Sequence, residues 1–201
     1  MNVADLLDRH KVGWSRAAQH QFLSAVRDGT IPEPAFNTWL AQDYRFAADL
    51  LRFQARLLGK ASRRAQVTLA AGLVALVDEL EWFERQAAGR NIDLEASPLP
   101  ATLAYGRLLE RLDSVDFPVA LTMLWALERA YLDAWTYAAP GAPAYGEFIA
   151  HWTTPHFASY VAALEAAANE TLHEAADVDV LFTEVIEAEV GFWDMAWERV
   201  T

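Results

Sequence analysis

The stretch FPVALTMLWALERAYLDAWTY, residues 117–137, carries apolar side chains at spacings of three and four, the period of an α-helix. One stripe along it consists of Leu121, Trp125, Glu128, Leu132 and Trp135. Asp116 stands at the N-cap position before the stretch, and Pro118 suits the first turn of a helix. We therefore predict a long buried helix whose apolar stripe carries a carboxyl group.

The rest of the chain follows the same period, and the sustained alternation that is typical of strands is hard to find. Breakers divide it into further predicted helices: Val3 to Arg27, Pro34 to Leu58, Ala61 to Ala88, Ala101 to Leu112, Tyr145 to His173 with an interruption near Pro155, and one after Asp177. Gly59 and Gly89 are expected to end the second and third of these. The prediction is an all-α bundle of seven to eight helices, with residues 1–201 in a single domain.

Composition excludes several classes of protein. The 201 residues are 54% hydrophobic, which excludes a disordered chain and suits one sizeable core. The formal net charge of −12 argues against partners such as nucleic acid or an anionic membrane surface. The chain has no cysteine, so disulfides, Cys-ligated zinc and thiolate catalysis are excluded. Because neither a signal segment nor a membrane span is visible, a cytoplasmic location is expected.

Acids lie on the apolar stripes of three predicted helices. Asp43 continues a stripe that contains Phe36 and Leu40, and Glu189 continues one that contains Phe182 and Ile186. Glu128 is the third such acid, in the stretch quoted above. One interpretation is a structural network, since inward acids are often paired with Arg or bound by Tyr or Trp donors. The other is an acid–base site, because burial raises a carboxyl's pKa and lets one acid donate a proton beside another that stays ionised.

Metal and haem sites have less support from the residues. Di-iron bundles usually need two Glu-x-x-His units, and only Glu170 to His173 has this spacing. His20 is a conceivable haem ligand, but a lone histidine in an apolar stripe is more often a packing or hydrogen-bonding residue. No Gly-rich phosphate loop or nucleophile elbow is present. We therefore expect no metal and no cofactor.

Several segments together resemble the TenA family, also called thiaminase II or aminopyrimidine aminohydrolase. The matching segments are His20-Gln21-Phe22, Asp28 to Pro32, Trp39 to Tyr44, Ala104-Tyr105, Phe148 to Trp152 and Glu189 to Ala196. The resemblance implies a haem-oxygenase-like helical fold and assembly as a homo-oligomer, a dimer or a tetramer. It also implies a small-molecule partner, a 4-amino-2-methylpyrimidine held between aromatic side chains.

The resemblance implies roles for particular residues. Asp43 matches the aspartate that hydrogen-bonds the aminopyrimidine, and Glu189 matches the glutamate that moves protons during substitution at the exocyclic methylene. Tyr105 matches a tyrosine of the pocket. Phe46 and Trp152 replace two other pocket tyrosines, which keeps stacking but removes hydroxyl groups.

The main departure from typical members is the missing Pro-Cys motif, whose cysteine displaces thiazole from thiamin. The chain resembles the cysteine-less subgroup, in which a glutamate on the corresponding helix takes over, and Glu128 is the candidate. Trp125 and Tyr131, on the same helix, complete the expected substrate-binding residues. The prediction is hydrolysis of aminomethyl- or formylaminomethyl-pyrimidine to hydroxymethylpyrimidine, with Glu189, Glu128 and Asp43 as catalytic residues, rather than cleavage of thiamin itself.

Two alternatives remain from the sequence. One is a non-catalytic pyrimidine-binding or regulatory protein that keeps the aromatic pocket. The other is a PqqC-like or di-iron oxidase on the same fold, against which the five widely scattered histidines argue.

Overall fold

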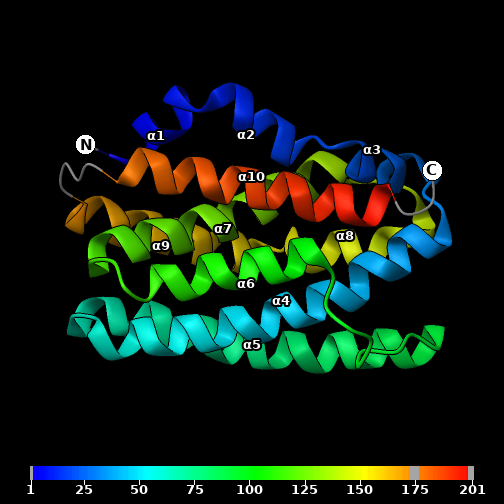
Figure 1. Cartoon of the computed structure of the whole chain (residues 1–201), viewed down its shortest axis with the longest axis horizontal. Helices are drawn as coiled ribbons and strands as arrows, with labels where there is room; N and C mark the ends of the chain where they lie inside the picture. The colour runs from blue at the N-terminus through cyan, green and yellow to red at the C-terminus, as the bar shows by residue number, and fades with distance from the viewer. Residues whose placement is uncertain (1, 173–176, 199–201) are drawn as a thin grey trace.

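The computed structural model describes residues 2–172 and 177–198, which form ten α-helices and one short 3₁₀ helix (Figure 1). In chain order these are α1 (Val3–Arg9), α2 (Lys11–Ala18), α3 (Gln21–Asp28), α4 (Glu33–Lys60), α5 (Arg63–Arg90), α6 (Pro100–Leu112), α7 (Phe117–Ala138), η1 (Pro143–Tyr145), α8 (Gly146–Trp152), α9 (Pro155–Thr171) and α10 (Val178–Trp197). The all-α prediction is confirmed. Counting α1 to α3 as one broken segment gives eight helices.

The stretch that predicted a buried helix becomes α7, the central helix of the bundle. It packs against α2, α3, α4, α8, α9 and α10. Because neighbours surround it on nearly all sides, most of its residues are buried, including Trp125, Glu128 and Trp135. Its N-cap residue is Asp116 as predicted, although the Asp116 side chain makes no capping hydrogen bond.

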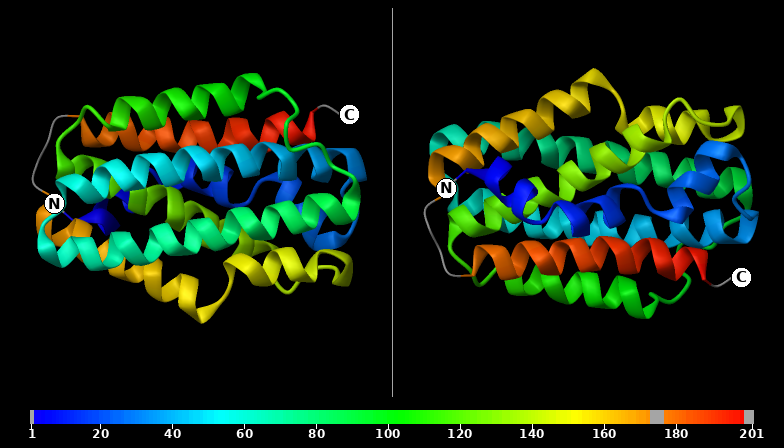
Figure 2. Two further views of the ribbon diagram at one scale, coloured as in Figure 1. Left: turned by 90° about the horizontal axis from the view of Figure 1, so that it is seen from below. Right: turned by 90° about the horizontal axis from the view of Figure 1, so that it is seen from above.

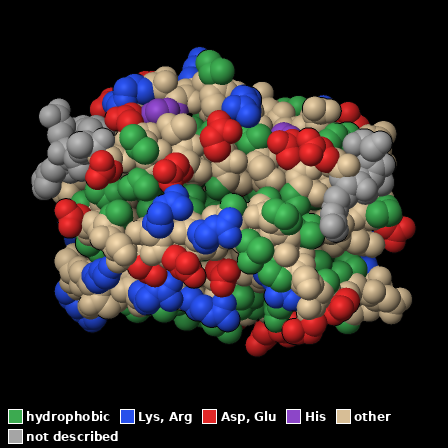
Figure 3. Space-filling model, viewed as in Figure 1, with side chains coloured by type: hydrophobic (Ala, Val, Ile, Leu, Met, Phe, Trp, Pro, Cys, Tyr) green, Lys and Arg blue, Asp and Glu red, His purple; other side chains and the backbone are tan. Residues whose placement is uncertain are grey.

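The remaining helices pack in layers around α7. In Figure 1, α1 to α3 lie on one face of the bundle and α5 on the opposite face, beside α4. Figure 2 shows α6 and α10 side by side. In the described part of the chain, no helix combines the length and apolar character needed to cross a membrane. Figure 3 shows acidic and basic side chains interspersed with hydrophobic ones over one face of the molecule.

The prediction of one continuous helix from Val3 to Arg27 is wrong, because the structure divides this segment into α1, α2 and α3. His10 and Gln19 leave the helical conformation at the two breaks. His20 is the N-cap residue of α3, because its ring Nδ1 accepts a hydrogen bond from the backbone N–H of Phe22 at 3.2 Å. A histidine in this capping role leaves the apolar period intact, so periodicity alone does not reveal the break.

Two predicted helix ends also differ. The helix α4 continues through Gly59 to Lys60, and α5 continues through Gly89 to Arg90. Asn91 provides the left-handed conformation that ends α5, with φ 55°. The interruption near Pro155 is confirmed as the break between α8 and α9, where Thr154 caps α9. The helix α9 ends at Thr171, where Leu172 is extended, so it stops before the predicted end; His173 itself lies outside the described residues.

Candidate active site

Four carboxyl groups, each from a different helix, approach one another inside the bundle. Asp43 of α4, Glu79 of α5 and Glu128 of α7 line one small cavity. Glu189 of α10 lies close enough that its charge acts on both Asp43 and Glu128. The structure therefore brings together the three acids expected from the sequence and adds Glu79 to them.

Asp43 and Glu189 are the most deeply buried of these acids, with 2% and 1% of their surface exposed. Tyr131 donates a hydrogen bond to Oδ1 of Asp43 at 2.5 Å, and Tyr105 donates one to Oε1 of Glu189. Burial raises the pKa of Asp43 well above its usual value, although the Tyr131 hydroxyl opposes the shift. Burial also raises the pKa of Glu189 to about 8 against the Tyr105 hydrogen bond. Among the described residues, Oε2 of Glu189 has no hydrogen-bond partner.

Glu128 and Glu79 have pKa values near neutral pH. Burial raises the pKa of Glu128 to about 8, and the charge of Glu79 adds to this shift. Burial raises the pKa of Glu79 to about 7, against a hydrogen bond that Nε1 of Trp152 donates to its Oε1 at 2.9 Å. A carboxyl group with such a pKa takes up and releases a proton readily near pH 7, as a general acid or base must.

The inner cavity between these acids is small and connects to a larger outer groove. Its volume is about 20 Å³, which is room for about one water molecule. It shares Leu76, Glu79, Glu128 and Trp152 with the outer groove, whose volume of about 640 Å³ suits a small organic molecule. Glu79 and Glu128 therefore face the groove as well as the inner cavity. A pyrimidine ring enters the inner cavity only if aromatic side chains of its wall shift.

Aromatic rings form much of the wall around the acids. Phe46, Tyr131 and Trp152 line the inner cavity, and the Tyr131 and Trp152 rings meet edge to face with centroids 5.7 Å apart. Tyr105 stands one layer behind, with its ring centroid 4.5 Å from that of Phe46. These four residues, all expected from the sequence, thus surround the carboxyl groups with flat apolar surfaces that suit a planar ligand.

Trp125, which the sequence predicts in the substrate site, lies apart from the other candidates. It is fully buried, its ring stacks on Phe182 with centroids 6.4 Å apart, and it lines neither the inner cavity nor the outer groove. It shares a stripe with Glu128 but precedes it by three residues, close to one helical turn. Helical period indicates a shared face and not a shared depth along the axis, so Trp125 packs in the core beyond the site.

Sequence reasoning missed Glu79, although a signal was available. Glu79 continues a stripe on α5 formed by Leu69, Gly72, Leu76 and Phe83, all of them buried. This is the same pattern that identified the other three acids. Its side chain is 19% exposed because it lies where the inner cavity opens to the groove.

The wall of the outer groove adds a second group of residues that sequence reasoning missed. Trp82 and His151 line it and stack with ring centroids 4.0 Å apart. Burial lowers the pKa of His151 to about 4, so the ring is neutral at pH 7. Its Nε2 lies 4.0 Å from Oε1 of Glu79. The neutral imidazole therefore offers the Glu79 carboxyl group no positive charge.

His20 is a hydrogen-bonding residue. Its Nε2 lies 2.9 Å from Oδ1 of Asp194, and its Nδ1 caps α3, so protein groups engage both ring nitrogens. Over residues 2–172 and 177–198, no group of three or more His, Cys, Asp or Glu side chains is arranged to hold a metal ion. His173, which completes the Glu-x-x-His unit of the sequence, lies outside the described residues.

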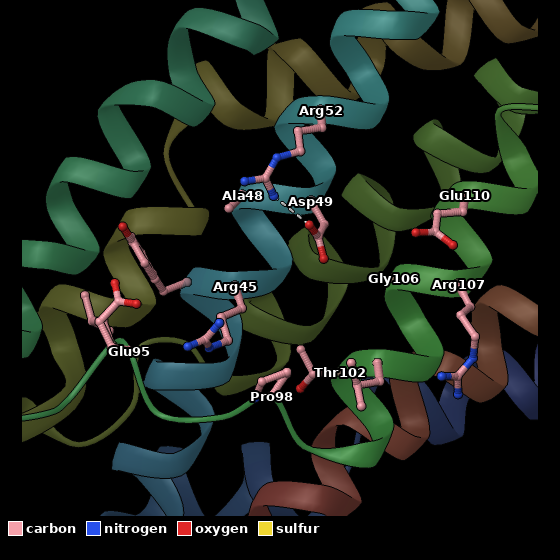
Figure 4. Close-up of a pocket in the computed structure, with 13 residues that line it drawn as sticks. Arg45, Ala48, Asp49, Arg52, Glu95, Pro98, Thr102, Gly106, Arg107 and Glu110 are labelled. Atoms are coloured by element: carbon pink, nitrogen blue, oxygen red, sulfur yellow. Dashed lines mark hydrogen bonds and ion pairs between the residues drawn. The ribbon is translucent and has the colours of Figure 1, made fainter.

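A separate surface cleft of about 410 Å³ lies between α4 and α6 (Figure 4). Arg45, Arg52 and Arg107 line it together with acidic side chains, and Arg52 donates a hydrogen bond to Asp49 at 2.7 Å. Of the predicted site residues, Asp43, Phe46, Glu128, Tyr131 and Trp152 line the inner cavity. Tyr105 and Glu189 are hydrogen-bonded to each other behind its wall. The charges of this cleft largely offset one another, so it offers no comparable acid–base centre.

The sequence of this chain is similar to those of known proteins. Residues 7–199 match the model of the TENA/THI-4/PQQC family. A "Probable bifunctional TENA-E protein" of Glycine max is 32% identical over 207 residues, which cover 94% of this chain and 90% of that protein. An "Aminopyrimidine aminohydrolase" of Halalkalibacterium halodurans is 24% identical over 221 residues, which cover 98% of this chain and 96% of that protein.

A solved structure shows the same fold. The crystal structure of a TenA homologue from Pyrococcus furiosus has a TM-score of 0.92 and 30% sequence identity to this chain. The match covers 98% of this chain and 100% of that one. The expected all-α, haem-oxygenase-like architecture is thereby confirmed over nearly the whole length.

Proposed function

The chain belongs to the TENA/THI-4/PQQC family, and we propose that it hydrolyses aminomethyl- or formylaminomethyl-pyrimidine to hydroxymethylpyrimidine. Such a reaction belongs to the salvage of thiamin breakdown products. The relatives support a hydrolase of this kind, since one of them is described as an aminopyrimidine aminohydrolase. The residues that would carry out the reaction in this chain are carboxyl groups, because the sequence contains no cysteine.

The observation that carries the proposal is the pair Glu79 and Glu128, which line one aromatic-walled cavity with pKa values of about 7 and 8. In the hydrolysis, the oxygen of water bonds to the exocyclic carbon while the carbon–nitrogen bond breaks. A carboxylate takes one proton from the water, and a carboxylic acid gives one to the leaving nitrogen. Near neutral pH, this pair supplies both protonation states at once.

The other two acids complete the proposed site. Asp43 accepts a hydrogen bond from the ring amino group, while Tyr131 holds its Oδ1 in place. Glu189 is fixed by Tyr105, and its other oxygen, Oε2, takes up or releases a proton while the carbon–nitrogen bond is replaced by the carbon–oxygen bond. The flat faces of Phe46, Tyr131 and Trp152 stack on the pyrimidine ring.

The test is a product assay with the purified protein. Aminopyrimidine and formylaminopyrimidine are incubated separately with the wild type, with Glu189→Gln and with Glu110→Gln, an exposed control. Hydroxymethylpyrimidine is then measured by chromatography, and binding of each substrate by calorimetry. We expect product from the wild type and the control, and binding without turnover from Glu189→Gln.

Two outcomes contradict the proposal. Binding of either pyrimidine by the folded wild type without any product favours a pyrimidine-binding or regulatory protein. Full activity of Glu189→Gln removes Glu189 from the chemistry.

A further inference from the structure

Gln54 and Tyr160 meet in a buried hydrogen-bond network next to the carboxyl groups. Gln54 of α4 is fully buried, and its Nε2 donates to the backbone carbonyl of Leu69 at 2.9 Å. This bond fixes the orientation of the amide, so its Oε1 must act as an acceptor. The Tyr160 hydroxyl of α9 donates to that Oε1 at 3.2 Å.

Gly72 of α5 makes room for this meeting. A Cβ atom added at Gly72 would lie 2.3 Å from both Nε2 of Gln54 and the hydroxyl oxygen of Tyr160. Real Cβ atoms do not approach other atoms so closely, so any larger residue at this position displaces both groups. The glycine therefore allows the Gln54 amide and the Tyr160 hydroxyl to meet against the backbone of α5.

The Tyr160 hydroxyl also faces Glu128. Both residues line the outer groove, and the interaction of the hydroxyl with the Glu128 carboxyl lowers the pKa that burial raises. The titratable and charged side chains that line the cavity or groove with Glu128, or whose charge acts on it, are Asp43, Asp78, Glu79, Arg85, Tyr131, His151, His156, Tyr160 and Glu189. Within this set Tyr160 is the residue that is hydrogen-bonded to Gln54 and whose hydroxyl also acts on Glu128, across the groove that both residues line.

A tyrosine hydroxyl has one proton and faces two acceptors here. When Glu128 is ionised, the proton best serves its carboxylate, because hydrogen bonds to charged acceptors are the stronger ones. When Glu128 is protonated, its own O–H can donate to the Tyr160 oxygen, and the Tyr160 proton turns to Oε1 of Gln54. When Glu128 is protonated, Gln54 therefore gives the buried Tyr160 hydroxyl an acceptor, which it would otherwise lack.

We propose that Tyr160 and Gln54 are positioning residues that let Glu128 alternate between carboxylate and carboxylic acid without losing a hydrogen bond. This inference rests on the proposed function, in which such an exchange of protons is required of Glu128. Neither residue needs to touch the substrate for this role. Tyr160 acts on Glu128 directly, and Gln54 acts only through Tyr160.

The experiment is a ¹³C NMR titration of the glutamate carboxyl groups, in which Glu128→Gln identifies the Glu128 signal. It compares the wild type, Tyr160→Phe, Gln54→Met and the double variant, with Tyr44→Phe as a tyrosine control outside the site. Tyr160→Phe should raise the midpoint of Glu128 by about one pH unit, because the carboxylate loses a donor. Gln54→Met should lower it, because the protonated state loses the alternative acceptor.

The double variant tests the order of action. Because Gln54 acts through the hydroxyl, adding Gln54→Met to Tyr160→Phe should leave the midpoint where Tyr160→Phe placed it. Shifts in the same direction for both single variants, no shift beyond that of Tyr44→Phe, or additive shifts in the double variant would overturn the inference. The titration needs no substrate, so an absence of turnover contradicts the proposed function separately and leaves this result to stand or fall alone.

Discussion

Two regions of the molecule hold acids with different partners. At the edge formed by α1 and α10, Asp179 accepts a hydrogen bond from Arg9, and its Oδ1 lies 2.8 Å from Nε2 of His10. In the inner cavity, the acids accept hydrogen bonds from neutral tyrosine and tryptophan side chains. The partners of Asp179 lower its pKa, led by Arg9, whereas burial raises the pKa of Glu79 and Glu128. Asp179 is also 45% exposed, so water stabilises its charge. An acid beside cations at the surface serves structure, and buried acids with neutral donors keep a proton available for chemistry.

Among the changes that compare these two regions, the largest expected effect comes from Glu128→Gln, which keeps the shape of the side chain and removes its proton exchange. We expect kcat for hydroxymethylpyrimidine formation to fall by about 10² to 10⁴-fold, the usual contribution of a general acid or base. Asp179→Asn, at the surface edge, should leave kcat unchanged. Steady-state kinetics of both variants decide this, and equal losses in the two would erase the distinction between the regions.

The same substitution should stabilise the fold at high pH. The pKa of Glu128 is about 8 in the folded chain and lies near its ordinary value of 4.5 when unfolded. The folded state therefore holds the proton more tightly, and its stability falls as pH rises from about 4.5 to 8. Glu128→Gln should gain on the order of 5 kcal/mol in unfolding free energy over the wild type at pH 9, relative to their difference at pH 4.

Urea unfolding at the two pH values measures this gain. If the unfolding free energies of the wild type and the variant differed by the same amount at both pH values, the pKa of Glu128 would not be raised by folding. Asp179→Asn should show the opposite pH dependence, because the lowered pKa of Asp179 stabilises the folded wild type at neutral pH and not in acid. The variant should therefore be less stable than the wild type at neutral pH, and this difference should shrink as the pH falls.

Two glycines of α5 sharpen the comparison along a single helix. Gly72 faces Gln54 and Tyr160 beside the site, whereas an added Cβ at Gly89 meets nothing within 4 Å. Gly89→Ala should stabilise the protein by about 0.5–1 kcal/mol through helix propensity. Gly72→Ala should instead destabilise it by about 1–3 kcal/mol, because overpacking outweighs that gain. Differential scanning calorimetry distinguishes the two, and a stabilised Gly72→Ala would show that the network yields without cost.

The smallest effect belongs to the surface ion pair itself. Because Asp179 and Arg9 are both more than a third exposed, Asp179→Asn should cost less than about 1 kcal/mol at pH 7. The loss should shrink in 1 M salt, where the charges are screened. Chemical unfolding at low and high salt measures it. A larger, salt-independent loss would mean that this edge is buried in the way the inner cavity is.

The sequence pattern predicted three of the four acids, and particular residues show why it stopped there. Asp43, Glu128 and Glu189 stand on clear apolar stripes, because a helix buried on one face repeats its apolar residues every three or four positions. Glu79 stands on a stripe of the same kind and was overlooked, with Gly72 as one of its members. Trp125, which the sequence also predicts in the site, lies in the core and lines neither cavity, because a stripe specifies a face of the helix and leaves the position along its axis open.

The network of Gln54 and Tyr160 had no sequence signal at all. The two residues are 106 positions apart and meet only because α4, α5 and α9 converge around Gly72. A buried glutamine is unremarkable in a helical pattern until its acceptor and donor partners are known.

The sequence by itself determined the helical class, most helix boundaries and which side chains point inward, because these follow from local period and from breaker residues. It also determined that this chain offers no thiol to a ligand or a reaction, since it has no cysteine. Only the tertiary structure decided which inward acids share one cavity and which receive neutral donors in place of cations. Those properties depend on distances between helices, and a pKa is set by the burial and charges that the packing of helices brings together.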